Sequence, residues 1–158
     1  MIAAYGRPHT WSWLLTFHVI SAIVLVGAAI TVAILSIAAI RQTDAARVTL
    51  LRRLALRTTL FLAIPAFLGA HIFGMILAGK EYPSGVKTPG WLEDGFGLTD
   101  AFGVFGIIVL GLLQWWVLRR TRSGKTHGWQ AQLATWLSPV TMVLLFVVLF
   151  AMAGKPGQ

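Results

Sequence analysis

The sequence contains no cysteine, and only five of its 158 residues are aspartate or glutamate. Without cysteine, the chain can form no disulfide and can supply no thiolate to a metal site or an iron–sulfur cluster. The few carboxylates form no pair inside an apolar segment, so the usual arrangement for general acid–base chemistry is missing. The sequence also lacks a Walker loop and a nucleophile–base motif.

Apolar residues, in contrast, make up 57% of the chain, and the mean hydropathy is +0.77. This composition is too apolar for a water-soluble domain, in which one face of each element must be polar. The segment Trp11–Leu35 runs for 25 residues with a single ionisable side chain, His18. An apolar run longer than about 20 residues spans the ~30 Å hydrocarbon core as a helix. The segment is therefore predicted to cross a membrane.

Three further apolar segments follow, so the chain is expected to be one transmembrane domain over residues 1–158. Its predicted fold class is all-α, an integral membrane four-helix antiparallel up-down bundle. The helices are predicted at about 11–40, 54–79, 100–118 and 131–153. Residues 80–99 are predicted to form a loop, with Thr99 as the N-cap of the third helix. Pro65 and Pro139 lie near the middle of the second and fourth helices and predict a bend in each.

The charge distribution predicts the orientation of the bundle. Lysine and arginine number 13, for a net charge of +8, and nine of them lie in segments 41–57 and 119–128. By the positive-inside rule these segments are cytoplasmic, which places both termini and loop 80–99 outside the cytoplasmic (inner) membrane. The arginines are expected to snorkel to the membrane surface and contact lipid headgroups. The expected partner is thus the lipid bilayer, and no nucleic acid is expected.

Two histidines lie inside predicted membrane helices, where an ionisable residue suggests a functional site. His18 follows Trp11 by seven residues, roughly 10 Å below the outer interface at 1.5 Å per residue. His71 precedes Lys80 by nine residues, roughly 13 Å below the same interface. The two imidazoles thus reach a similar depth. Small residues, which allow helices to approach closely or leave room for a flat ligand, lie near them at helical spacing: Ser21, Ala22, Ala66, Ala70, Gly74 and Ala78.

Neutral imidazole is a good ligand for haem iron, and histidines from facing helices can hold haem within a bundle. We therefore expect haem b to bind between His18 and His71, in a protein that transfers electrons or anchors a redox complex. In the alternative, the histidines only tie helices together by hydrogen bonds. The chain would then be a non-catalytic membrane subunit that packs with other subunits or forms a homo-oligomer.

A third interpretation is a protein that handles copper or a small solute. His71 and Met75 are four residues apart on one helix face, and Met152 is expected near the outer end of the fourth helix, so a soft copper(I) site can be drawn from them. Asp100, at the outer start of the third predicted helix, suits either a cation or proton relay or the helix dipole. Loop residues Tyr82, Trp91 and Phe96 are expected to cover the opening of the site.

The segment Leu15–Gly27 (LTFHVISAIVLVG) resembles the first helix of a group of small bacterial four-helix membrane proteins. In that group a histidine near the outer end precedes small residues, in a pattern near LHxxxAxxWxGG. Membrane domains of the copper-resistance type and haem-dependent membrane protoporphyrinogen oxidases have similar openings. The resemblance implies that His18 is the family-type histidine and Gly27 its small partner, with Leu25 where a tryptophan is common and Ala28 in place of the second glycine.

Overall fold

The computed structural model describes residues 12–123 and 128–154, and every regular element in these ranges is a helix. The helices join into four rods. The first is α1 (Ser12–Ile40), and the fourth is α6 (Trp129–Gly154). The second and third rods each contain a π-helical segment between two α-helices: α2 (Ala45–Thr58), η2 (Thr59–Ala63) and α3 (Ile64–Glu81), then α4 (Gly90–Leu98), η3 (Thr99–Val104) and α5 (Phe105–Arg122). Each rod is long and apolar enough to cross a membrane.

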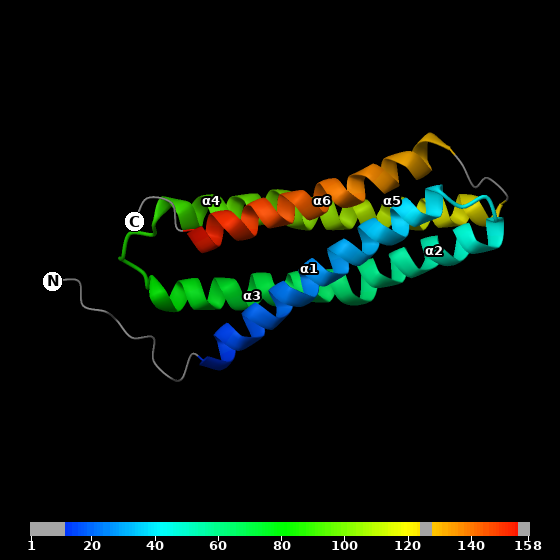
Figure 1. The fold of residues 1–158 in the computed structure, drawn as a ribbon. Coiled ribbons are helices and arrows are strands. Elements are labelled where there is room, and N and C mark those ends of the chain that lie inside the picture. Colours follow the sequence, from blue (N-terminus) through cyan, green and yellow to red (C-terminus); the bar gives the residue numbers. More distant parts are fainter. Residues whose placement is uncertain (1–11, 124–127, 155–158) are drawn as a thin grey trace.

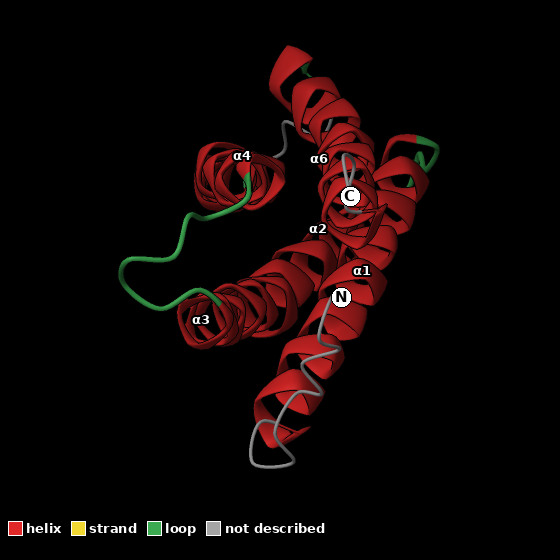
Figure 2. Cartoon of the chain, turned by 90° about the vertical axis from the view of Figure 1, so that its left-hand side faces the viewer, coloured by secondary structure: helices red, strands yellow, loops and turns green. Residues whose placement is uncertain are grey.

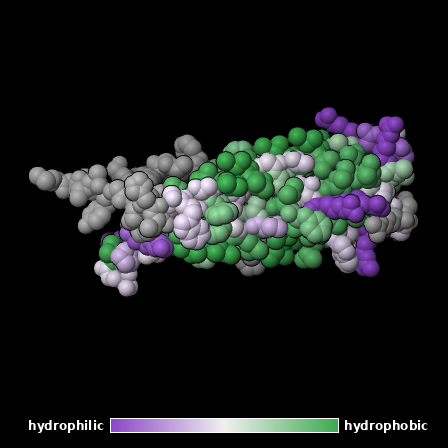
Figure 3. Space-filling model, turned by 90° about the horizontal axis from the view of Figure 1, so that it is seen from below, coloured by the Kyte–Doolittle hydropathy of each residue, from purple (hydrophilic) through white to green (hydrophobic). Residues whose placement is uncertain are grey.

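The rods lie lengthwise beside one another (Figures 1 and 2). The start of α1, the end of α3, the start of α4 and the end of α6 lie at one end, here called the histidine end. The turn from α1 to α2, the end of α5 and the start of α6 lie at the other, here called the basic end. In Figure 3 apolar residues cover the middle of the visible face, and strongly hydrophilic residues gather at the basic end. Exposed arginines at that end are Arg41, Arg47, Arg53, Arg119 and Arg120.

Small residues let the rods pack closely at the centre of the bundle. The main apolar core comprises Leu25, Ala28, Ala63, Ala66, Phe67 and Ile107, which come from α1, η2, α3 and α5. Helix α1 packs against α2, α3 and α6, while α5 packs against α2 and α6. Large apolar side chains such as Ile23, Phe61 and Leu112 point outward, as expected for contact with lipid.

The third rod begins earlier than the sequence predicts. Residues 90–98 form α4, which continues into η3 and α5, so only residues 82–89 connect the second and third rods. Thr99 is therefore not an N-cap. It lies within the rod, and its hydroxyl donates to the carbonyl of Gly95 at 2.7 Å. The segment GWLEDGFGL contains three glycines and two acids and resembles a loop in composition, but α4 packs against α6.

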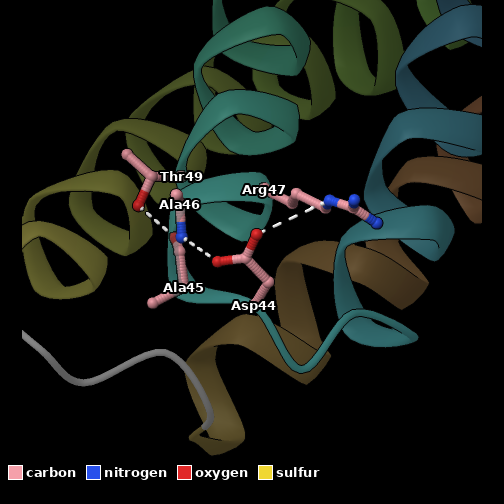
Figure 4. A network of polar contacts seen from close by, with 5 residues as sticks. All are labelled: Asp44, Ala45, Ala46, Arg47 and Thr49. Carbon is pink, nitrogen blue, oxygen red and sulfur yellow. Dashed lines mark hydrogen bonds and ion pairs between the residues drawn. The ribbon is translucent and has the colours of Figure 1, made fainter.

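The second rod also begins early, at Ala45, with Asp44 as its N-cap (Figure 4). Pro65 is the second residue of α3, and Ile64 lies between it and η2. The Ile64 N–H donates to the carbonyl of Thr59, five residues earlier. The backbone irregularity near this proline thus includes a π turn, a feature that is often found at functional sites. Pro139 lies inside α6, and the helix continues on both sides of it.

Candidate functional site

His18 and His71 line the same cavity, which has a volume of about 510 Å³ and lies towards the histidine end. Side chains from α1, α3, α4 and α6 and Thr99 of η3 form its walls. Apart from the two histidines and Thr99, the lining is apolar or glycine, including Phe67, Phe96 and Leu145. Ligand pockets in proteins commonly have volumes of about 300–1,000 Å³, with mainly apolar walls and a few polar groups. The cavity has these properties.

The His18 ring packs directly on the backbone of α3. Its Nδ1 lies 2.8 Å from the carbonyl oxygen of Ala70. A Cβ at Gly74 would lie 3.1 Å from Cε1 of His18, so the absence of a side chain at position 74 leaves room for the ring. Ser21 of α1 also lies close to α3, because a Cβ at Gly69 would be 2.6 Å from its Oγ. The small residues of α3 therefore leave room for the His18 side chain, which comes from α1.

The His71 ring lies between the cavity and a carboxylate. Its Nε2 is 3.3 Å from Oδ1 of Asp100 in η3. The ring stacks on Phe67, with centroids 5.8 Å apart, and meets Phe96 edge-on at 6.0 Å. Its Nδ1 is buried and has no hydrogen-bond partner among the described residues. One ring nitrogen therefore contacts a carboxylate, and the other is buried without a partner among the described residues.

A glycine allows η3 to approach α3 at this point. A Cβ at Gly103 would overlap the ring of Phe67, the residue on which His71 stacks. The position of Asp100 relative to His71 therefore depends on this close approach. The sequence indicates Asp100 as a possible relay, but its pairing with His71 could not be predicted from the sequence. The pairing depends on the rotation of η3 about its axis.

The hydrogen bonds indicate which nitrogen of each imidazole carries the lone pair. A backbone carbonyl only accepts, so His18 donates through Nδ1–H to Ala70, which leaves the lone pair on Nε2. Asp100 is an acceptor when ionised, so His71 donates through Nε2–H, which leaves the lone pair on Nδ1. Metal-ligating histidines usually donate their other N–H to a carbonyl or carboxylate in this way. Both histidines have this second partner.

The remaining predicted site residues differ in their relation to the cavity. Phe96 lines the cavity, whereas Tyr82 is not part of its described lining. Met75 is 47% exposed and is not part of the described lining of the cavity. The side chains of Trp91 and Met152, and His9 and His127 as whole residues, lie outside the described part of the chain. Within residues 12–123 and 128–154, no three His, Cys, Asp or Glu side chains converge as a metal site.

No model of a known protein family, no curated protein and no solved structure matches the chain. The class of protein follows from the structure alone: the described residues form an all-helical protein with four helices long and apolar enough to cross a membrane. The function has to be argued from the cavity and its two histidines.

Proposed function

We propose that this is an integral membrane protein that binds haem b, and that it transfers electrons or anchors a redox complex. Its four rods form an antiparallel up-down bundle, with the basic end in the cytoplasm and both termini outside. The apolar faces of the rods and the arginines gathered at one end support this arrangement. The histidine cavity then lies in the outer half of the membrane.

One observation supports the haem proposal most directly: two imidazoles line a single cavity. Each imidazole has a hydrogen-bond acceptor at one ring nitrogen and its lone pair on the other. His18 is bonded to Ala70 and His71 to Asp100. If the histidines only tied helices together, the buried Nδ1 of His71 would be expected to have a partner, because unpaired polar atoms are costly in a membrane. It has none among the described residues.

The residues present suit haem in three respects. The cavity volume of about 510 Å³ is in the range of ligand pockets, and its walls are apolar, as a porphyrin requires. Nδ1 of His71 has no partner among the described residues, so it is the nitrogen of that ring that would bind iron. Haem bound by two imidazoles would supply one-electron transfer, without an open position for oxygen. The protein would hold the cofactor through His18 and His71 and exclude water with Phe67 and Phe96.

An absorption spectrum of the detergent-purified protein, produced in cells supplied with haem, tests the proposal. We expect a low-spin spectrum of the bis-imidazole type, with one haem per chain. His18→Ala and His71→Ala should each abolish or convert this spectrum, with an unchanged elution volume in size-exclusion chromatography. His127→Ala is the matched control, because it removes a histidine from a polar segment, and it should retain the wild-type spectrum.

Two results would count against the proposal. If the folded wild-type protein binds no haem, haem binding is wrong and the chain is better described as a packing subunit. If either alanine variant keeps the low-spin spectrum, the substituted histidine is not a ligand. Met75→Leu tests the copper alternative, because it removes a thioether that the copper site would use. If haem is the ligand, this variant should bind haem as the wild-type protein does.

A further inference from the structure

The cavity that holds His18 and His71 is not enclosed on all sides. Two of its lining residues, Val19 and Ile23 of α1, are 45% and 65% exposed. The other described residues of the lining are buried or half-buried. Val19 and Ile23 are four residues apart, so they lie on one face of α1. They mark the side on which the cavity meets its surroundings.

Contacts described above close two sides of the cavity. His18 and Ser21 pack closely on the glycines of α3, which closes the side between α1 and α3. His71 meets the ring of Phe96 edge-on and contacts Asp100 through Nε2. These two contacts join α3 to the third rod and close the side between them.

Large apolar side chains close the cavity along the length of the bundle. Towards the basic end, Leu25 and Phe67 belong to the main apolar core and are 5% and 4% exposed. Towards the histidine end, Leu14 and Leu92 are 1% and 7% exposed. These two leucines lie about one helical turn nearer that end than the lining residues of α1 and α4. Water at the histidine end is therefore separated from the cavity by buried leucines.

The remaining side lies between α1 and α6, which separate towards the histidine end. In the half nearer the basic end the two helices touch, since Oγ of Ser36 lies 3.3 Å from Oγ of Ser138. From there they diverge, and the start of α1 lies apart from α6 (Figures 1 and 2). Val19 and Ile23 of α1 and Val148 of α6 line the cavity on this side. We call this side the lateral opening.

The lateral opening lies at the depth of the acyl chains. Val19 and Ile23 follow Ser12, the first residue of α1, by seven and eleven residues, roughly 10 and 16 Å along the helix. The exposed side chains next to them on α1, Ile20 and Val24, are also apolar. A molecule that passes through the lateral opening must therefore be dissolved in the membrane.

Haem, the ligand given by the proposed function, meets this requirement. It has an apolar ring and two carboxylates at one edge, and an amphipathic group in a bilayer keeps its polar end at the interface. No Lys, Arg, Asp or Glu belongs to the described lining of the cavity, so the cavity suits the ring and not the carboxylates. We infer that haem enters sideways from the outer leaflet, through the lateral opening at Val19 and Ile23. This inference rests on the proposed function.

The rate of haem uptake tests the route. Full-length apoprotein in phosphatidylcholine vesicles is mixed with excess haem, and uptake is followed by the appearance of the bis-imidazole spectrum. Ile23→Trp narrows the lateral opening and should slow uptake by about 10-fold or more, because overpacking of the path raises the barrier. Release of haem to an apoglobin should slow as well, since the same opening serves both directions.

Ile20→Trp is the matched control. Ile20 is 50% exposed on the same helix and at a similar depth, but it is not part of the described lining of the cavity. This variant should take up and release haem at the wild-type rates. Ile23→Ala provides a second variant in case Ile23→Trp does not fold, and it should speed uptake because it widens the lateral opening.

Three results would overturn the inference. Equal uptake rates in Ile23→Trp and Ile20→Trp would show that haem takes another path. Faster release from Ile23→Trp than from the wild-type protein would indicate a damaged site and not a narrowed entrance. In the third, Ile23→Ala takes up haem no faster than the wild-type protein. The final spectrum of the wild-type protein tests haem binding separately, so a wrong route is distinguished from a wrong ligand.

Discussion

Nε2 of His71 lies 3.3 Å from Oδ1 of Asp100, and this pair links a buried cavity to the surface of the bundle. The histidine side chain is 14% exposed, whereas the aspartate side chain is 61% exposed. The carboxylate holds the orientation of the ring through its Nε2. Because the Asp100 side chain is exposed, it can be replaced without opening the apolar core.

The first prediction concerns this carboxylate. Asp100→Ala removes the acceptor for Nε2–H of His71, and we expect haem affinity to fall about 10- to 100-fold, as for other partners of metal-ligating histidines. Haem titration of the apoprotein measures the effect. Asp94→Ala removes an exposed acid from the same rod and should retain wild-type affinity. Equal affinity in both variants would show that Asp100 has no role in binding.

The second prediction concerns the space that Gly74 leaves for His18. A Cβ at position 74 would already lie 3.1 Å from Cε1 of His18, so Gly74→Leu should displace the ring and abolish the bis-imidazole spectrum. Gly79→Leu is the control on the same helix, because nothing lies within 4 Å of a Cβ at that position. A normal haem spectrum in Gly74→Leu would mean that His18 binds no iron from its position against α3.

The third prediction concerns the contact between η3 and α3. Gly103→Ala places a methyl group within the ring of Phe67, and overpacking of this kind typically costs about 1–3 kcal/mol. The free energy of unfolding in detergent should fall by that amount relative to Gly97→Ala, which meets nothing within 4 Å. The control accounts for the gain in helix propensity that alanine brings at both positions. A Gly103→Ala variant as stable as the control would show that the contact adjusts without cost.

The fourth prediction concerns orientation, and the cysteine-free sequence makes its test simple. Ser84→Cys lies in the connection between α3 and α4, and Ser123→Cys lies at the end of α5; both positions are exposed. A membrane-impermeant thiol reagent applied to intact cells should label position 84 and should label position 123 only after the membrane is opened. The reverse pattern would invert the orientation.

The existence of four membrane-length helices could be predicted from the sequence, because the length of an apolar run alone determines whether it spans the hydrocarbon core. The shared cavity of His18 and His71 could also be predicted, since the rise per residue places the two histidines at a similar distance from the same end of the bundle. Helix α4 could not be predicted, because its glycine-rich segment has no long apolar run and packs as a helix against α6.

Features that depend on rotation about a helix axis were harder to predict from the sequence. The partner of His71 depends on the angular position of Asp100, which η3 changes relative to a regular α-helix. The sequence predicts that Arg52 snorkels to the surface with the other arginines of its segment, and this is wrong, because Arg52 is only 2% exposed. Its burial depends on which face of α2 meets α6, and the evenly basic segment 41–57 contains no strong pattern that distinguishes one arginine from the next.

The π-helical segment η2 sets the rotational phase between the two halves of the second rod. A π turn holds one more residue than an α turn, and each residue of an α-helix corresponds to about 100° of rotation. Deletion of one residue within 59–63 would therefore turn the side chains of α3 by about 100° relative to α2. Arg52 and His71 could then not both keep their present directions, one towards α6 and the other towards the cavity. The spacing between these two residues is thus constrained in angle as well as in length.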